Sequence, residues 1–238
     1  TAVIWKSNTP TIYSSWSNVF SKLKLILGKV GQSFSIIDNL TFVHYYFDFQ
    51  NISNSTFHGL KFVTCDTASS SYCNTTLNNN YGIKLYWSWT KNNIFHTIEI
   101  SAYDGGIYLV SGASNNMFSY IDVYRANTWI YIENTTYNMF NNIHIHNNKD
   151  YWICIWDNVS YNVFNNVHAY DNERSIMTKP WNNIGSGEYN VFNNVQVYNN
   201  YVWIAFSNLT NSMFNNVSSY NNAWGVGGGI YTNSMTNS

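Results

Sequence analysis

The feature that most constrains this chain is a twelve-residue segment that occurs three times with few changes. It reads YNMFNNIHIHNN at residues 137–148, YNVFNNVHAYDN at 161–172 and YNVFNNVQVYNN at 189–200. Aligning other segments on its central Phe extends the repeat. We call these Phe residues the anchors: Phe57, Phe95, Phe118, Phe140, Phe164, Phe192 and Phe214, with Phe20 as an expected earlier one. From Phe95 onward they are 23, 22, 24, 28 and 22 residues apart. A period in the low twenties predicts a solenoid.

Each unit alternates with period two after its anchor, in the pattern Asn-x-Phe-x-x-(Ile/Val)-x-(Ile/Val), which is typical of strands. Most units contain a second strand-like run, such as YFDFQ at 46–50, IKLYW at 83–87, WIYIE at 129–133 and WICIW at 152–156. Asn-rich pairs separate the runs and favour turns. The pattern predicts an all-β chain whose rungs stack, because a single rung cannot bury its own apolar face.

This repeat resembles that of the right-handed parallel β-helix proteins, the pectate-lyase-like architecture shared by polysaccharide-active enzymes and viral tailspikes. The resemblance covers roughly residues 34–230 and implies a single-domain right-handed parallel β-helix with rungs of about 22–28 residues. The resemblance rests on the period and residue pattern of the repeat, which indicate the fold but give almost no information about activity. The Asp- and Arg-rich motifs of the polysaccharide enzymes are not visible, so we do not favour an enzyme.

The chain is predicted to divide into an N-terminal segment at 1–33 and the solenoid at 34–238, with a loop insertion at 64–80. The N-terminal segment is an arm, a first rung or a cap. Its stretch SSWSNVFSKLKLILG (14–28) fits the strand repeat, which we favour, or an amphipathic helix. Cys65 and Cys73 bracket the insertion and are predicted to form a disulfide. A disulfide favours an oxidising, extracellular setting.

Composition narrows the partners. Only 10% of residues are charged and the formal net charge is −1, which provides no attraction to nucleic acid or to anionic membranes. No apolar run approaches the roughly 20 residues that a membrane-spanning helix needs. No cofactor is predicted.

Outward positions of the first strand run provide the candidate site. Four residues after the anchor the column reads Lys61, Glu99, Asp122, His144, His168, Gln196 and Ser218, and six residues after it Tyr124, His146, Tyr170, Tyr198 and Tyr220. The aromatic column is a candidate glycan-binding face, because aromatic faces stack on sugar rings. In an enzyme, Glu99, Asp122, His144 and His168 would be the acid–base groups. A merely solvated sheet face is the favoured alternative.

The histidines support a weaker hypothesis. His144, His146 and His168 are predicted to share one face, with Asp122 beyond them, and could hold zinc or copper. No metal-binding motif accompanies them, so no metal site is predicted.

The second strand run is apolar on both sides. We assign Phe47, Phe49, Leu85, Trp87, Ile130, Ile132, Cys154, Trp156, Ile204 and Phe206 to the interior, and Tyr46, Trp129, Tyr131, Ile153, Ile155 and Trp203 to the outside. An apolar outer face of this extent indicates a partner surface, covered by another subunit or by the N-terminal arm. A local insertion that covers the face within one chain is the alternative.

Sequons for N-glycosylation occur at Asn39, Asn51, Asn54, Asn74, Asn134, Asn158, Asn208 and Asn216. Four of them, Asn51, Asn134, Asn158 and Asn208, lie six residues before an anchor. They mark either a recurring turn, which we favour, or a glycosylated edge.

Together these features favour an extracellular structural or adhesive β-solenoid that self-assembles, as a filament subunit or a virion spike component. Its expected partners are further copies of the chain, through the apolar outer face and an open solenoid end, and surface glycans. A polysaccharide-active enzyme and a non-catalytic glycan- or receptor-binding module are the alternatives.

Overall fold

The computed structural model describes residues 11–12, 24–27, 37–38, 41–43, 46–50, 52–63, 81–101, 105–126, 128–148, 153–173, 177–178, 187–201, 204–223, 230–233 and 236–238. These residues form strands and turns and no helix. The disulfide predicted between Cys65 and Cys73, with the whole insertion at 64–80, lies outside the described residues. So do Phe20, Asn39, Asn51, Asn74 and Trp203.

Two long parallel sheets carry the fold. The anchor sheet contains β1 (Thr11–Ile12), β3 (Ile37–Asp38), β4 (Thr41–Val43), β6 (Thr56–Val63), β8 (Ile94–Ser101), β10 (Met117–Tyr124), β12 (Met139–His146), β14 (Val163–Tyr170), β17 (Val191–Tyr198) and β20 (Met213–Tyr220). The second sheet contains β2 (Lys24–Leu27), β5 (Tyr46–Gln50), β7 (Tyr81–Tyr86), β9 (Gly105–Val110), β11 (Thr128–Ile132), β13 (Ile153–Ile155), β15 (Met177–Thr178), β18 (Ile204–Ser207) and β21 (Ile230–Asn233). A small third sheet pairs β16 (Gly187–Glu188) with β19 (Leu209–Thr210).

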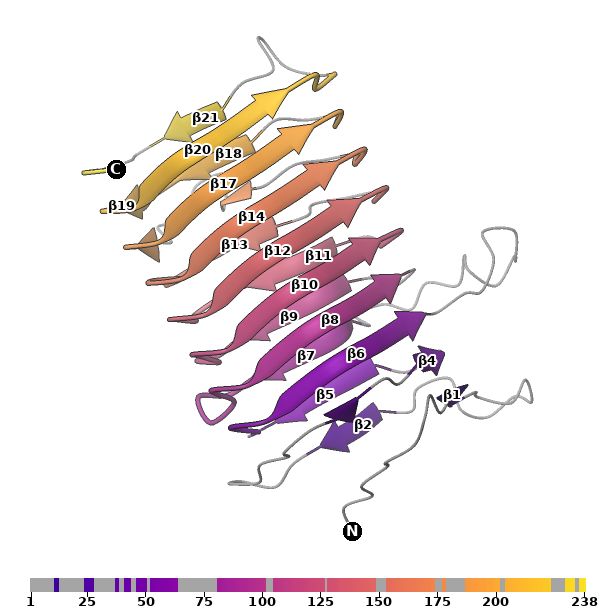
Figure 1. The fold of residues 1–238 in the computed structure, drawn as a ribbon. Coiled ribbons are helices and arrows are strands. Elements are labelled where there is room, and N and C mark those ends of the chain that lie inside the picture. The colour runs from indigo at the N-terminus through magenta and orange to yellow at the C-terminus, as the bar shows by residue number, and fades with distance from the viewer. Residues whose placement is uncertain are drawn as a thin grey trace.

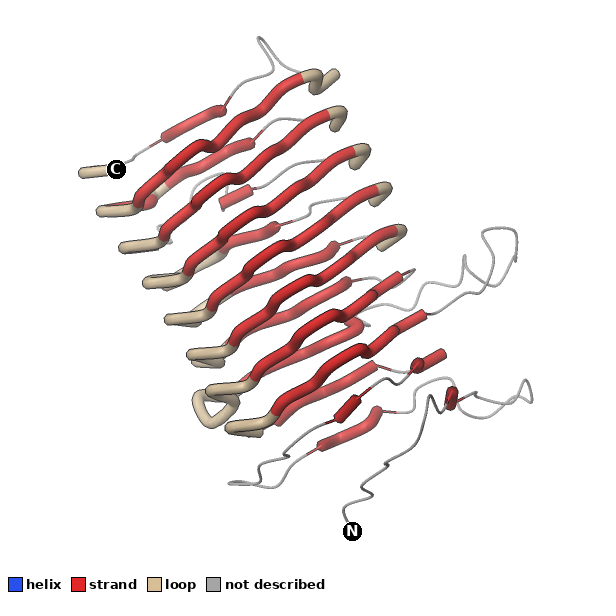
Figure 2. The backbone as a smooth tube through the Cα atoms, viewed as in Figure 1, coloured by secondary structure: helices blue, strands red, loops and turns tan. Residues whose placement is uncertain are grey.

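The chain alternates between the two long sheets, so each pair of strands forms one rung of a parallel β-solenoid (Figure 1). Figure 2 shows the rungs stacked along one axis, with turns along both edges. This confirms the all-β, single-domain solenoid predicted from the repeat. In the N-terminal segment, β2 is a strand paired with β5, which agrees with the strand interpretation for residues 24–27 and not with the helix.

The anchors form the centre of the core, as predicted. All seven, from Phe57 to Phe214, stack ring upon ring, with centroids 4.8–5.1 Å apart and planes within 9° of parallel. The strand register places each anchor beside the next, for example Phe140 beside Phe164. Three residues beyond each anchor, a column from Leu60 to Val195 is also buried. The repeated spelling is therefore a set of columns along the solenoid axis.

Each long strand of the anchor sheet bends two residues after its anchor. The residue there has a positive φ in every described rung: Gly59, Thr97, Tyr120, Asn142, Asn166, Asn194 and Asn216. Only glycine and, less readily, asparagine adopt this left-handed conformation without strain. The second Asn of each Phe-Asn-Asn triplet is therefore explained by backbone geometry.

Two columns of buried asparagines stabilise the corners. In the first, Asn116 donates two hydrogen bonds to Oδ1 of Asn138, one from its backbone N–H (3.0 Å) and one from its side-chain Nδ2 (3.1 Å). The pattern recurs from Asn93 to Asn190, and the second column links Asn148, Asn172 and Asn200 in the same way. Buried backbone donors at the corners would otherwise be costly, because water does not reach them.

The second sheet corrects the predicted orientation of the WICIW run. Ile153 and Ile155 were assigned to the outside, but both are buried in the core and pair with Ile130 and Ile132. Cys154, assigned to the interior, is buried, but it pairs with Tyr131, whose side chain is part-exposed on the opposite side of the strand from Ile153 and Ile155. With apolar residues at every position, alternation alone could not fix the register, and a one-residue slip exchanges the two faces.

Candidate functional site

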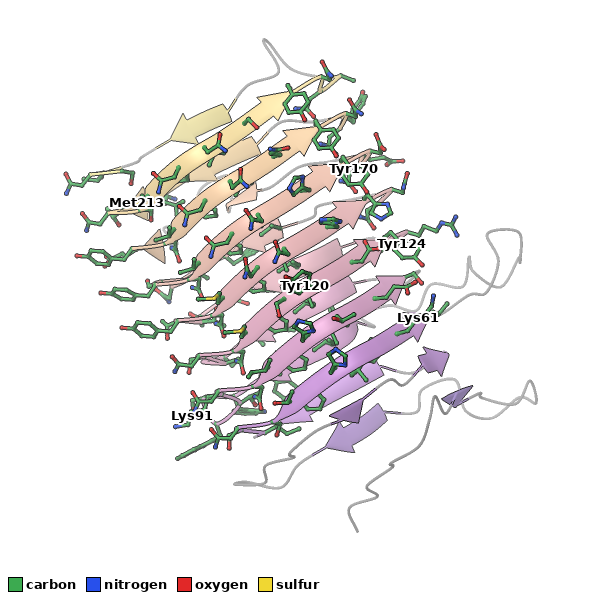
Figure 3. All side chains as sticks on the ribbon, in the orientation of Figure 1. Lys61, Lys91, Tyr120, Tyr124, Tyr170 and Met213 are labelled. Carbon is green, nitrogen blue, oxygen red and sulfur yellow. The ribbon has the colours of Figure 1, made fainter. Side chains whose placement is uncertain are left out.

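The candidate site lies on the outer face of the anchor sheet, along its edge toward the ends of the strands. Figure 3 shows Lys61, Tyr124 and Tyr170 along one edge, opposite Lys91 and Met213. The register brings Glu99 beside Asp122, and His144 beside His168. The alternation of the strands therefore places the predicted polar residues on one face, as the sequence indicated.

A small ionic network occupies the first rungs of this face. The Nζ of Lys61 lies 2.7 Å from Oε1 of Glu99, and the hydroxyl of Tyr124 donates a hydrogen bond of 2.5 Å to the same oxygen. The hydrogen bond to Glu99 raises the pKa of Lys61 against the opposing effect of burial. Burial, reinforced by the hydrogen bond to Glu99, raises the pKa of Tyr124. Oε1 of Glu99 is thus engaged by both Lys61 and Tyr124.

Asp122 is engaged one rung further along. Its Oδ1 lies 3.1 Å from Nε2 of His146, which belongs to the next rung. A retaining glycosidase needs one carboxyl that holds a proton and a second that is free to attack. Glu99 contacts a lysine and a tyrosine, and Asp122 contacts a histidine. This geometry therefore lends the catalytic hypothesis no support.

The aromatic column is a continuous stack. Tyr124 and His146 have ring centroids 5.3 Å apart with planes 9° from parallel, and the stack continues through Tyr170 and Tyr198 to Tyr220 at 5.0–5.2 Å and 6–7°. Each inner ring has both faces covered by its neighbours. Sugar binding of the expected kind uses a ring face. The column therefore presents ring edges and polar atoms, and it acts as a ladder that ties the rungs together.

Of the three histidines predicted to share this face, His144 and His168 form a pair separate from the aromatic column. The rings of His144 and His168 are 5.5 Å apart and tilted by 59°. Burial lowers the pKa of His168, and the charge of His144 lowers it further. His146 is stacked in the aromatic ladder and bonded to Asp122. In the part of the chain that the structure describes, no three His, Cys, Asp or Glu residues are grouped to hold a metal ion.

The predicted partner face is placed only in part. Tyr131 faces outward and donates a hydrogen bond of 3.0 Å to Oε2 of Glu133. It also stacks on Tyr108, with ring centroids 4.8 Å apart. Tyr46 and Trp129 lie on β5 and β11, but their side chains are not described. Ile153 and Ile155 belong to the core, and Trp156, which the sequence assigned to the interior, packs instead against Tyr131 on the outer side, where its Nε1 donates to Sγ of Cys154.

The sequons at the corner behave as turns. Asn134, Asn158 and Asn208 all have φ between 51° and 54°, the left-handed conformation that the turn interpretation predicts. Nδ2 of Asn158 donates a hydrogen bond of 2.9 Å to Oδ1 of Asn134. Two further sequon residues, Asn54 and Asn216, also have positive φ. Their glycosylation stays a prediction.

Sequence reasoning missed the exposed apolar residues along the opposite edge. One residue before the anchors, Ile94, Met117 and Met213 are exposed on the outer face. At the neighbouring corner, Tyr137, Tyr161 and Tyr189 stack 4.9–5.0 Å apart. The recurring Tyr-Asn-x-Phe sequence could have predicted the tyrosine stack, because it places a Tyr three residues before successive anchors.

Trp87 was also misplaced. The sequence assigned it to the interior after Leu85, but it is exposed and has a φ of 80°. The strand β7 ends at Tyr86, so the alternation does not extend to Trp87.

Comparison with known proteins provides no family. No protein-family model matches the chain, and no curated protein matches it. In the described residues, no helix has the length and apolar character required to cross a membrane.

Proposed function

We propose that this chain is an extracellular structural and adhesive β-solenoid that assembles with further copies of itself, end to end, as the subunit of a filament or spike. The proposal is supported chiefly by the edge of the anchor sheet at β20. A filament follows from this arrangement because a head-to-tail contact that does not close into a ring repeats without limit.

The strand β20 is the last of the anchor sheet in the described part of the chain. Its inward residues are less covered than their equivalents one rung earlier. Phe192 and Val195 on β17 are buried, whereas Phe214 and Val217 on β20 are only partly buried. A sheet edge that leaves core residues accessible is a template for another strand.

Among the described residues the columns of the solenoid run as far as β20, and their last members determine what could cover this edge. Asn215 and Asn216 donate hydrogen bonds of 2.8 and 2.7 Å back to Asn193 and Asn194. Tyr220 stacks on Tyr198. In a head-to-tail contact the strand that continues these columns comes from the N-terminal edge of a second copy. The first described strand of that edge is β1, where Ile12 is in register with Phe42 and Phe62 of the following rungs. Added backbone pairing would provide affinity, and the matching columns would set the register.

The test is a charged residue on the inward side of β20. Val217→Lys places an ammonium group where the next strand would pack. Natural proteins use inward-pointing charges of this kind to block pairing at sheet edges. Ser218→Lys adds the same charge to the outward side of the same strand and is the matched control. Light scattering during size-exclusion chromatography and negative-stain electron microscopy report the assembly state, and circular dichroism reports the fold.

We expect the wild-type chain and Ser218→Lys to form long assemblies, and folded Val217→Lys to remain monomeric. A wild-type chain that stays monomeric at high concentration would overturn the proposal. Assemblies that persist unchanged in Val217→Lys would place the contact elsewhere and would also contradict it.

The extracellular setting is supported by the disulfide predicted between Cys65 and Cys73 and by the sequons. Disulfides persist in oxidising compartments. Its test is mass spectrometry of the native protein with and without reduction, combined with protease treatment of intact source cells or virions. Free thiols at both cysteines and full protection from protease would contradict this part of the proposal.

A further inference from the structure

The turn between β7 and β8 exposes two tryptophans. Trp87 is 53% exposed and Trp89 is 58% exposed, and Lys91 follows them. Figure 2 shows this turn projecting from the side of the solenoid, and Figure 3 places Lys91 on the edge opposite Tyr124 and Tyr170. The turn is therefore separate from both the polar network and the aromatic ladder described above. Large exposed indoles are unusual unless they contact something.

The turn projects because it is longer than its neighbours. The paired core residues Leu85, Leu109 and Ile132 align in the second sheet. Beyond the corner, Thr90, Ala113 and Thr135 are buried at equivalent positions, because the residues that follow them, Lys91, Ser114 and Thr136, pair with one another. The chain thus takes five residues to cross the first corner, against four and three at the next two.

The turn is held rigidly. The backbone N–H of Thr90 donates to the carbonyl of Trp87 at 3.0 Å, and Oγ1 of Thr90 donates to the carbonyl of Tyr86 at 2.8 Å. Ser88 lies against Gly112 of the next rung so closely that a Cβ on Gly112 would be 3.2 Å from Cα of Ser88. A rigid turn keeps the two indoles in place before a ligand arrives, which reduces the entropic cost of binding.

The backbone at Trp87 is strained. Its φ of 80° is rare for a bulky residue, and such strain persists where the surrounding structure enforces it, often at binding sites. Here the hydrogen bonds of Thr90 and the contact with Gly112 enforce it. The strain directs the indole outward instead of into the core.

The chemistry of the turn selects a ligand. Within the described residues, neither indole N–H has a hydrogen-bond acceptor, so both remain available as donors. Nζ of Lys91 lies 6.0 Å from the centre of the Trp89 ring and forms no ion pair with any described residue. Two aromatic rings, two N–H donors and one cation match a sugar ring that has an apolar C–H face, hydroxyl groups and a negative charge.

We propose that Trp87, Trp89 and Lys91 form a binding site for an acidic sugar, such as a uronic acid unit of a surface polysaccharide. The sugar ring stacks on an indole, its hydroxyl groups accept from the indole N–H groups, and its carboxylate pairs with Lys91. A membrane surface is the less favoured ligand, because stable interfacial binding needs a larger apolar face than two side chains. The site deepens the adhesive part of the proposed function and rests on it.

The experiment measures binding of hexagalacturonate to the full chain by isothermal titration calorimetry. Neutral cellohexaose and vesicles of phosphatidylcholine with phosphatidylserine are the comparison probes. The variants are Trp87→Ala, Trp89→Ala and Lys91→Gln, with Tyr120→Ala as the control, because Tyr120 is equally exposed at 58% but lies in the middle of the sheet. Gly112→Ala moves the turn without removing a group that contacts the sugar.

We expect hexagalacturonate binding to weaken about tenfold or more in each tryptophan variant, as for other central aromatic contacts. Lys91→Gln should remove the preference over cellohexaose, Gly112→Ala should weaken binding, and Tyr120→Ala should leave it unchanged. Three results would overturn the proposal: no binding of hexagalacturonate by the wild-type chain, binding of vesicles alone, or binding by both tryptophan variants that is as tight as that of the wild-type chain. Val217→Lys should bind normally, so failure of assembly and failure of binding are distinguishable.

Discussion

The ring of Phe140 lies directly over the ring of Phe164, with centroids 4.9 Å apart and planes 4° from parallel. Both are fully buried, and each has a further Phe on its other side. Phe140→Ala should therefore lower the free energy of unfolding by about 3–5 kcal/mol, the range for buried aromatic residues. Urea denaturation followed by circular dichroism measures it.

Phe214→Ala is the matched comparison, because Phe214 also stacks on a neighbouring Phe but is only partly buried. Its cost should be less than about half that of Phe140→Ala, since less apolar surface returns to water. Equal losses at the two positions would show that stacking within the column contributes little to stability.

Substituting one asparagine of the buried column should lower the stability of the fold markedly. Nδ2 of Asn138 donates to Oδ1 of Asn162 and to the carbonyl of Ala113, both at 3.1 Å. Asn138→Ala removes these donors and leaves two donors of Asn116 without an acceptor. We expect a loss of about 2–4 kcal/mol in the free energy of unfolding, from buried polar groups that lose their partners.

The control is Asn165→Ala, on the part-exposed face of the same sheet, where Asn193 donates one bond of 2.8 Å to Asn165. Water can replace this bond, so the change should cost less than about 1 kcal/mol. Asn138→Ser should fall between the two, because Ser212 occupies the equivalent place one rung beyond Asn190 and accepts from its backbone N–H at 3.2 Å. The ladder would be unimportant if Asn138→Ala and Asn165→Ala unfolded at the same urea concentration.

Substitution at Thr97 should stabilise the protein. Thr97 has a φ of 55° at the bend where four later rungs have asparagine. A β-branched residue is strained there, whereas asparagine tolerates this conformation. Thr97→Asn should raise the free energy of unfolding by about 0.5–1 kcal/mol, the usual scale of such backbone effects. It loses the exposed bond to His96, which is worth little in water.

Asn142→Thr, the reverse change at an equivalent bend, should destabilise by a similar amount. The pair is measured by thermal unfolding under one set of conditions. A stabilising Asn142→Thr, or a destabilising Thr97→Asn, would show that backbone strain does not decide the residue at this bend.

The success of the sequence analysis can be traced to the anchors. A repeated Phe at nearly constant spacing fixes which residues lie over one another, so the column from Phe57 to Phe214 and the outward positions of Glu99 and His168 followed directly. The WICIW run failed because Ile153 and Cys154 are both acceptable in a core. The register against β11 decides which of them faces inward, and alternation does not reveal that register in a run that is apolar throughout.

The character of the candidate site was harder to foresee. The sequence placed Tyr124, His146 and Tyr170 in one column, but ring orientation depends on side-chain torsions that no spelling records. Because the rings stack face to face, their faces are covered by one another, and the column expected to bind sugars instead links the rungs. Trp87 was missed because its exposure depends on a positive φ, which sequence patterns predict for glycine and asparagine but not for tryptophan.

The pair of His144 and His168 should make stability depend on pH. His168 faces His144 on one side and the uncharged Gln196 on the other, and burial and His144 lower its pKa below the usual 6.5. The unfolded chain then binds more protons than the folded chain between the two pKa values, so stability falls as pH decreases through this window. Above about pH 7.5 both states are neutral at this residue and the effect disappears.

His168→Gln places on β14 the residue that β17 already has at this position. It should leave the urea midpoint at about pH 8 nearly unchanged and reduce the loss of stability between about pH 7 and pH 5. His146→Gln is the comparison, because Nε2 of His146 lies 3.1 Å from Oδ1 of Asp122, whereas the sheet neighbours of His168 are His144 and Gln196. If wild type and His168→Gln lost stability in parallel over this range, the proton uptake would have to occur at another residue.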